Sequence, residues 1–152
     1  MSEILTGQTL LIKNVISYRF KASFKNVESE IMKLEEYTKK KKASKTGNST
    51  SVTYNVEMIA GEQWLDMEVK IPLDKEIKSH KNFEFEKEFC VENALMITHK
   101  GNPNELMNTV NELIAYINEN KIAPKTPMYN VTVNDGKVGG IEAMAIDIYI
   151  GV

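Results

Sequence analysis

The chain has little of what marks several large classes of protein. Its 152 residues include a single cysteine, Cys90, which excludes an internal disulfide and therefore a disulfide-stapled secreted fold. No apolar run approaches the roughly 18–20 residues that a membrane-spanning helix needs, and the N-terminus does not have the pattern of a signal peptide. The net charge is only -2, whereas nucleic-acid binders usually carry a basic excess. We therefore expect a cytoplasmic protein with no membrane segment and no direct nucleic-acid partner.

The chain does contain enough apolar material for a core. Hydrophobic residues make up 42% of the sequence, which argues against disorder. At about 100–200 residues per domain, the length predicts one domain spanning residues 1–152.

Two segments of the chain resemble each other. Residues 14–37 align without gaps on residues 93–116 at an offset of 79, with the same order of strand, turn and helix. The closing strands 68–73 and 147–152 are also 79 residues apart. We therefore predict a duplication, with repeat one at about 9–73, a crossover at 74–87 and repeat two at about 88–152.

One matching stretch departs from this offset. Tyr54-Asn55-Val56 matches Tyr129-Asn130-Val131 at an offset of 75. The alignment therefore predicts four extra residues after the helix of the first copy and four extra residues in the hairpin of the second.

Each copy has the pattern of a β-α-β-β unit. In the first copy we expect a strand kinked at Asn14, a helix with apolar residues at one-face spacing, and two strands joined by Ala60-Gly61. These elements are expected at residues 9–20, 25–42, 52–58 and 63–72.

The second copy has clearer boundaries. Asn102 and Glu105 form a capping box at the start of a helix, and Asn134-Asp135-Gly136 predicts a turn between strands at 128–133 and 142–150. Two such units predict an α+β fold with pseudo-twofold symmetry, antiparallel sheets, and two helices packed on one face.

The last strand of each copy carries a carboxylate at an equivalent position. Side chains alternate between the faces of a strand, so Glu68 and Asp147 lie opposite the apolar residues that pack on the helices. If a pseudo-twofold axis relates the copies, both carboxylates face one central groove.

Aromatic walls around such carboxylates would suit an organic cation, because each ring adds about 0.5–2 kcal/mol of cation–π attraction. The candidate wall residues are Tyr18, Trp64, Tyr116, Tyr129 and Tyr149. The alternative is that Glu68 and Asp147 are ordinary solvated residues and that the aromatics belong to the core or the surface.

Several motifs resemble those of the GyrI-like effector-binding domains of AraC-type and MerR-type regulators, which share the SOUL-type fold. His99-Lys100-Gly101, followed by the helix ending at Tyr116, is similar to their His-x-Gly…Leu-x-x-Trp pattern. Tyr129 resembles the tyrosine of their next strand, and residues 147–152 and 68–73 resemble their closing motifs.

This resemblance implies a groove between two halves that binds cationic or amphipathic small molecules. Asp147 matches the central glutamate of the family, one methylene shorter, and Tyr116 stands where a tryptophan is common. A chain that begins with the effector domain has no room for a helix-turn-helix before Thr9, so we expect a stand-alone binding protein. The alternatives are a protein-interaction module, such as a gyrase inhibitor or an accessory factor, and a hydrolase of reactive electrophiles. The hydrolase would use Asp147 as base with Tyr116 or Tyr149.

No cofactor or metal is predicted. His99 before a glycine is typical of a structural hydrogen-bonding residue rather than a haem ligand, and His80 has no metal-ligand spacing. Cys90 aligns with Leu11, which predicts a buried small hydrophobe. The stretch 136–140 lacks the spacing of a phosphate loop and predicts a hairpin tip. The sequence does not indicate the oligomeric state.

Overall fold

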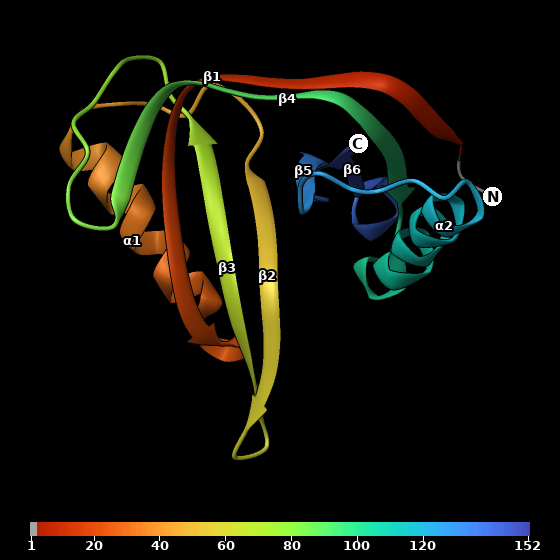
Figure 1. Ribbon diagram of the computed structural model, residues 1–152. Helices are drawn as coiled ribbons and strands as arrows, with labels where there is room; N and C mark the ends of the chain where they lie inside the picture. Colours follow the sequence, from red (N-terminus) through yellow and green to blue (C-terminus); the bar gives the residue numbers. More distant parts are fainter. Residues whose placement is uncertain (1–2) are drawn as a thin grey trace. The chain divides into compact units, whose positions relative to one another are not determined.

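The computed structural model describes residues 3–152, which form two compact units (Figure 1). One unit is Leu11–Phe89, here called the first unit. The second unit combines Cys90–Val152 with the segment up to Leu10. Helices and antiparallel strands occur in both units, which confirms the predicted α+β class.

The first unit has the predicted β-α-β-β order. Its elements are the part of β1 (Ile4–Ser23) that follows Leu10, the 3₁₀ turn η1 (Phe24–Asn26), α1 (Val27–Lys40), β2 (Thr50–Ile59) and β3 (Glu62–Pro72). The central strand β3 pairs antiparallel with both β1 and β2, and α1 lies along one face of this sheet (Figure 1).

The core of the first unit lies between α1 and the sheet. Leu34 of α1 is completely buried, and it packs in one cluster with Met67, Val69 and Ile71 of β3. Because strand residues alternate between faces, this cluster confirms that the odd-numbered residues of β3 face the helix.

The second unit repeats this architecture. Its elements are β4 (Phe83–Lys100) from Cys90 onward, η2 (Pro103–Glu105), α2 (Leu106–Glu119), β5 (Met128–Asn134), η3 (Ile141–Ala143) and β6 (Ala145–Gly151). The central strand β6 pairs with β4 and β5. Leu113 and Ile117 of α2 pack against Ile97 of β4 and Ile148 of β6 in the core.

The two units correspond residue by residue at an offset of 79. The helices α1 and α2 both begin and end 79 residues apart, and each follows a 3₁₀ turn. Positive φ angles recur at Asn14 (54°) and Asn93 (50°), which confirms the predicted kink at Asn14. Leu73, which follows β3, donates its backbone N–H to the Asn14 carbonyl over 2.7 Å. Val152, which follows β6, donates its backbone N–H to the Asn93 carbonyl over 3.2 Å.

The offset of 75 predicted for the middle strand is wrong. Val52 pairs with Glu68, and Val131 pairs with Asp147, so the offset remains 79 along β2 and β5. Both strands also contain a register shift at the equivalent place, next to Thr53 and Thr132. Sequence identity over three residues was misleading, because register is determined by pairing along the whole strand.

Several predicted boundaries also change. The strand predicted at 142–150 begins at Ala145, because Glu142 lies in η3. The strand β4 begins at Phe83, inside the segment assigned to the crossover. The helix predicted from Lys25 begins at Val27 after η1.

The start of α2 differs in detail from the predicted capping box. The side chain of Asn102 accepts a hydrogen bond from the backbone N–H of Asn104 over 2.9 Å rather than from Glu105. A 3₁₀ turn therefore precedes the α-helix, which begins at Leu106.

Candidate functional site

The sheet face of the first unit that lies opposite α1 carries a network of paired charges. Arg19 donates two hydrogen bonds to Asp66, over 3.1 and 3.0 Å, and its guanidinium lies 3.9 Å from the ring centre of Tyr54. The Tyr54 hydroxyl donates to Glu68 over 2.7 Å. The hydrogen bonds from Arg19 lower the pKa of the Asp66 carboxyl, which stays ionised in this pairing.

Lys70 is the most buried charge of this face, with 5% of its side chain exposed. Its Nζ lies 3.1 Å from the Ser17 hydroxyl, 3.6 Å from Glu68, 3.9 Å from Glu86 and 4.4 Å from the centre of the Phe89 ring. A buried ammonium requires such partners, because an unpaired buried charge is strongly destabilising. The charge of Glu68 is therefore already compensated within its own unit.

A pocket of about 240 Å³ lies on the same face of the first unit. One wall is the half-buried ring of Trp64, directly across from Glu57 in the neighbouring strand. The complete lining consists of Lys21, Asn55, Glu57, Ile59, Trp64, Leu65 and Asp66. Trp64 thus lies beside the carboxylates Glu57 and Asp66, whereas Glu68, four residues after Trp64 on the same strand, is not among the lining residues.

The corresponding face of the second unit is organised differently. Asp147 is half-buried and accepts a hydrogen bond from the Thr98 hydroxyl over 2.6 Å. Tyr149 lies on the same face of β6 and pairs with Tyr129 of β5, which is buried. The structure therefore brings together three of the predicted ligand-binding residues: Asp147, Tyr149 and Tyr129.

The two cations beside Glu68 have neutral counterparts beside Asp147. Thr98 occupies the position of Arg19, and Tyr149 that of Lys70. No ion pair to Asp147 exists among residues 3–152. Burial, and then the negative charge of Asp147, raises the pKa of the Tyr149 hydroxyl, so this phenol is neutral at physiological pH.

Tyr18 and Tyr116 lie on the other side of their sheets. Tyr18 is buried in the α1-facing core, where its hydroxyl donates to Glu30 over 2.5 Å. Burial, followed by this hydrogen bond and the Glu30 charge, raises its pKa to about 12. Tyr116 projects from α2 and packs against the core cluster of the second unit. The structure does not bring either ring to the face that carries Glu68 or Asp147.

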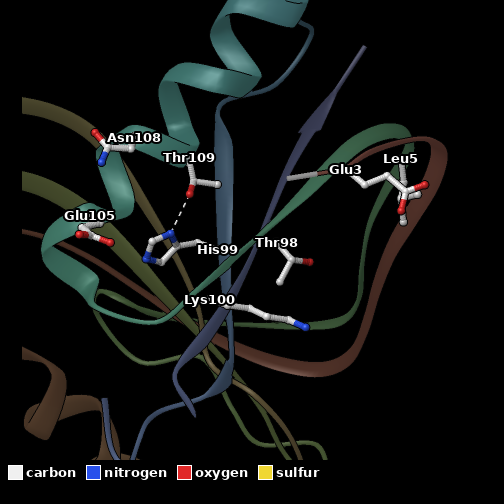
Figure 2. A pocket seen from close by; sticks show the side chains of 8 residues that line it. All are labelled: Glu3, Leu5, Thr98, His99, Lys100, Glu105, Asn108 and Thr109. Atoms are coloured by element: carbon white, nitrogen blue, oxygen red, sulfur yellow. Dashed lines mark hydrogen bonds between the residues drawn. The ribbon is translucent and has the colours of Figure 1, made fainter. Parts of the chain in front are cut away.

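A second pocket, of about 490 Å³, opens beside the start of α2 (Figure 2). His99 lies in its wall and is almost fully buried. The His99 Nδ1 lies 2.7 Å from the Thr109 hydroxyl, and its Nε2 lies 2.9 Å from the carbonyl oxygen of Asn102. Both ring nitrogens are therefore engaged in hydrogen bonds, as expected of a structural histidine.

Sequence reasoning missed the two hydroxyl donors to the candidate carboxylates, Thr98 and Tyr54. Thr98 could have been predicted from the repeat, because Arg19 pairs with Glu68 and the residue 79 positions after Arg19 is Thr98, which pairs with Asp147. Tyr54 could not have been predicted in this way, because it contacts Glu68 from the point in β2 where the register shifts.

The structure was also searched for a metal site. Within the described part of the chain, no group of three or more His, Cys, Asp and Glu residues could hold a metal ion.

Cys90 is exposed, so the prediction that it is buried is wrong; its counterpart Leu11 is also exposed. Residues 3–152 include no helix with the length and apolar character needed to cross a membrane.

Solved structures show what the fold is similar to. The crystal structure of the EcmrR C-terminal domain has a TM-score of 0.72 and 16% identity, covering 99% of this chain and 97% of that one. EcmrR in its DNA complex has a TM-score of 0.73 and 14% identity, but this chain spans only 56% of its length. A hydrolase from Listeria innocua has a TM-score of 0.57 and 11% identity, covering 98% of this chain and 90% of that one. At these identities the likeness shows the fold alone, and it supports the predicted GyrI-like fold.

Comparison at the level of sequence identifies the family. No curated protein matches the chain. A family described as "Domain of unknown function (DUF5085)" matches residues 11–152, which is nearly the whole length. The chain belongs to the DUF5085 family.

Proposed function

We propose that this protein is a small-molecule-binding domain whose ligand is an organic molecule with a positive charge, bound at Asp147. The observation that carries the proposal is the surroundings of this carboxylate. It is half-buried, its hydrogen-bond donor is the neutral Thr98 hydroxyl, and it has no ion-pair partner among residues 3–152. A partly desolvated carboxylate attracts a cation more strongly than an exposed one does.

Two tyrosine rings beside Asp147 fit the same class of ligand. Tyr149 is a neutral phenol at physiological pH, and it pairs across the strands with Tyr129. A cation over the face of such a ring gains about 0.5–2 kcal/mol. Both rings project from paired strands, so little ordering of the backbone opposes binding.

Glu68 lies in the first unit and is not part of the site proposed at Asp147. Its carboxylate already accepts from Tyr54 and lies 3.6 Å from the Lys70 ammonium, so a ligand cation would compete with existing partners. Trp64 lines the 240 Å³ pocket on the same face of the first unit and is not part of the site proposed at Asp147. Tyr18 and Tyr116 are left out of the proposed site because they pack in the cores.

Isothermal titration calorimetry with benzyltrimethylammonium, and with benzyl alcohol as the neutral analogue, tests the proposal. We expect the cation to bind wild type, the alcohol to bind at least tenfold more weakly, Asp147→Asn to lose most of the cation affinity, and Glu68→Gln, in the first unit, to bind as wild type does. Asp135→Asn, an exposed carboxylate of the same unit, is the matched control and should bind as wild type does. Equal affinity of wild type and Asp147→Asn, or no binding of the cation to wild type, would refute the proposal.

A second candidate function is hydrolysis of a reactive electrophile. The observation that favours it is the neighbouring pair of Asp147, as a base for water, and Tyr149, as a neutral phenol able to donate a hydrogen bond. A solved structure of similar fold is called a hydrolase. Assays with activated esters and epoxides should show turnover that disappears in Asp147→Asn; turnover that survives this substitution would eliminate the proposed base.

A further inference from the structure

The 490 Å³ pocket beside α2 is separate from the proposed cation site and has different chemistry. Its volume lies within the roughly 300–1,000 Å³ typical of small-molecule sites. The lining residues are Glu3, Leu5, Thr98, His99, Lys100, Glu105, Asn108 and Thr109. Leu5 is the one aliphatic side chain among these lining residues, and no aromatic carbocycle is present, so the pocket suits a polar ligand.

Charges of both signs line this pocket. Lys100 lies at the end of β4, Glu105 at the start of α2, and Glu3 in the N-terminal segment (Figure 2). All three are exposed, and none of them makes an ion pair among residues 3–152. One ammonium and two carboxylates are therefore available to a ligand that carries both charges.

The wall between these charges is held in place by hydrogen bonds. The Asn102 carbonyl can only accept, so the Nε2 of His99 carries a proton. In the neutral imidazole, Nδ1 then accepts from the Thr109 hydroxyl, which leaves the Thr109 oxygen able to accept a hydrogen bond from a ligand N–H. The neighbouring Asn108 amide adds both a donor and an acceptor to the same wall.

We propose that this pocket binds a small zwitterion of the amino-acid or dipeptide class. Its carboxylate pairs with Lys100, and its ammonium pairs with Glu105, with Asn108 and Thr109 as hydrogen-bonding partners. The pocket also includes Thr98, whose hydroxyl is hydrogen-bonded to Asp147. An occupant would therefore lie one side chain away from the proposed cation site, but the proposal does not depend on that site.

The test is an NMR titration of the ¹⁵N-labelled full chain with glycylglycine, glycine, L-lysine and L-glutamate at millimolar concentrations. We expect at least one of these zwitterions to shift the amide signals of residues 98–109 saturably. For that probe, its Nα-acetylated form and its C-terminal amide should each bind at least tenfold more weakly, because one lacks the α-ammonium and the other lacks the α-carboxylate.

Variants assign the charges within the pocket. Lys100→Met and Glu105→Gln should each weaken binding about tenfold or more, and Asn108→Trp, which fills the pocket from an exposed helix position, should abolish it. Lys125→Met and Glu119→Gln change exposed residues of the same unit outside the lining and should bind as wild type does. Asp147→Asn should remove most of the cation affinity and leave zwitterion binding in place, which separates failure of one proposal from failure of the other. If none of the four zwitterions shifts residues 98–109, or if the acetylated and amidated forms bind equally well, the proposal is wrong.

Discussion

Replacing Tyr18 with phenylalanine tests whether this residue is a structural part of the α1-facing core. The substitution keeps the ring, which contacts Phe20 and Phe83 at centroid distances of 5.1 and 4.9 Å, and removes the hydroxyl that donates to Glu30. A hydrogen bond to a charged group contributes about 1.5–3 kcal/mol. We therefore expect Tyr18→Phe to lower the free energy of unfolding by about this amount at pH 8.

The pH dependence of this loss is more diagnostic than its size. The pKa of Tyr18 is raised from 10.0 to about 12 in the folded protein, so the folded state holds the phenol proton more tightly than the unfolded state does. This stabilisation is complete below pH 10 and is lost as pH rises through 12. Between pH 9 and 11.5, wild type should lose about 2 kcal/mol relative to Tyr18→Phe.

Urea unfolding of both proteins at several pH values between 9 and 11.5 measures this difference directly. Glu30→Gln is the matched control: it keeps an acceptor oxygen but lacks the charge, so the pH dependence should shrink while the contribution from burial remains. The reasoning is refuted if the stability difference between wild type and Tyr18→Phe stays constant over this pH range.

Three further predictions concern the stability of the two units. Leu34→Ala and Leu113→Ala, both at completely buried equivalent positions, should each lower the free energy of unfolding by about 2–5 kcal/mol in urea titrations; a loss below about 1 kcal/mol at either site would contradict the core assignment. Asn14→Ala and Asn93→Ala should each cost about 1–2 kcal/mol in thermal unfolding, because φ is positive at both positions, while glycine there should be tolerated. His99→Leu should lower the free energy of unfolding by about 1–3 kcal/mol, because the buried Thr109 hydroxyl is left without its partner; unchanged chemical denaturation would show that the histidine is not structural.

The fold was predictable from the sequence because it depends on local periodicity. The alternation along the last strand of each copy correctly placed Asp147 and Glu68 opposite the helix-facing residues. The turn at Ala60-Gly61 also follows from local chemistry, and both residues have positive φ angles. Such features are determined by residues that are close together in the sequence.

The environment of each carboxylate was not predictable in the same way. Tyr18 was a candidate wall residue, but it pairs with Val69 and therefore faces the helix with it. That result depends on the register between distant strands, which a single sequence does not encode locally. The same long-range pairing gives Glu68 its cationic neighbours and gives Asp147 none, although the two residues occupy equivalent positions.

The boundary between the units at Leu10 affects how the protein can be shortened. The family match begins at residue 11, so a fragment cut at that limit looks complete when judged by sequence similarity. It would nevertheless lose Ile4, which packs against the core of the second unit, and both Glu3 and Leu5 of the pocket beside α2. The truncation would therefore destabilise the second unit, although most of that unit lies at the other end of the chain.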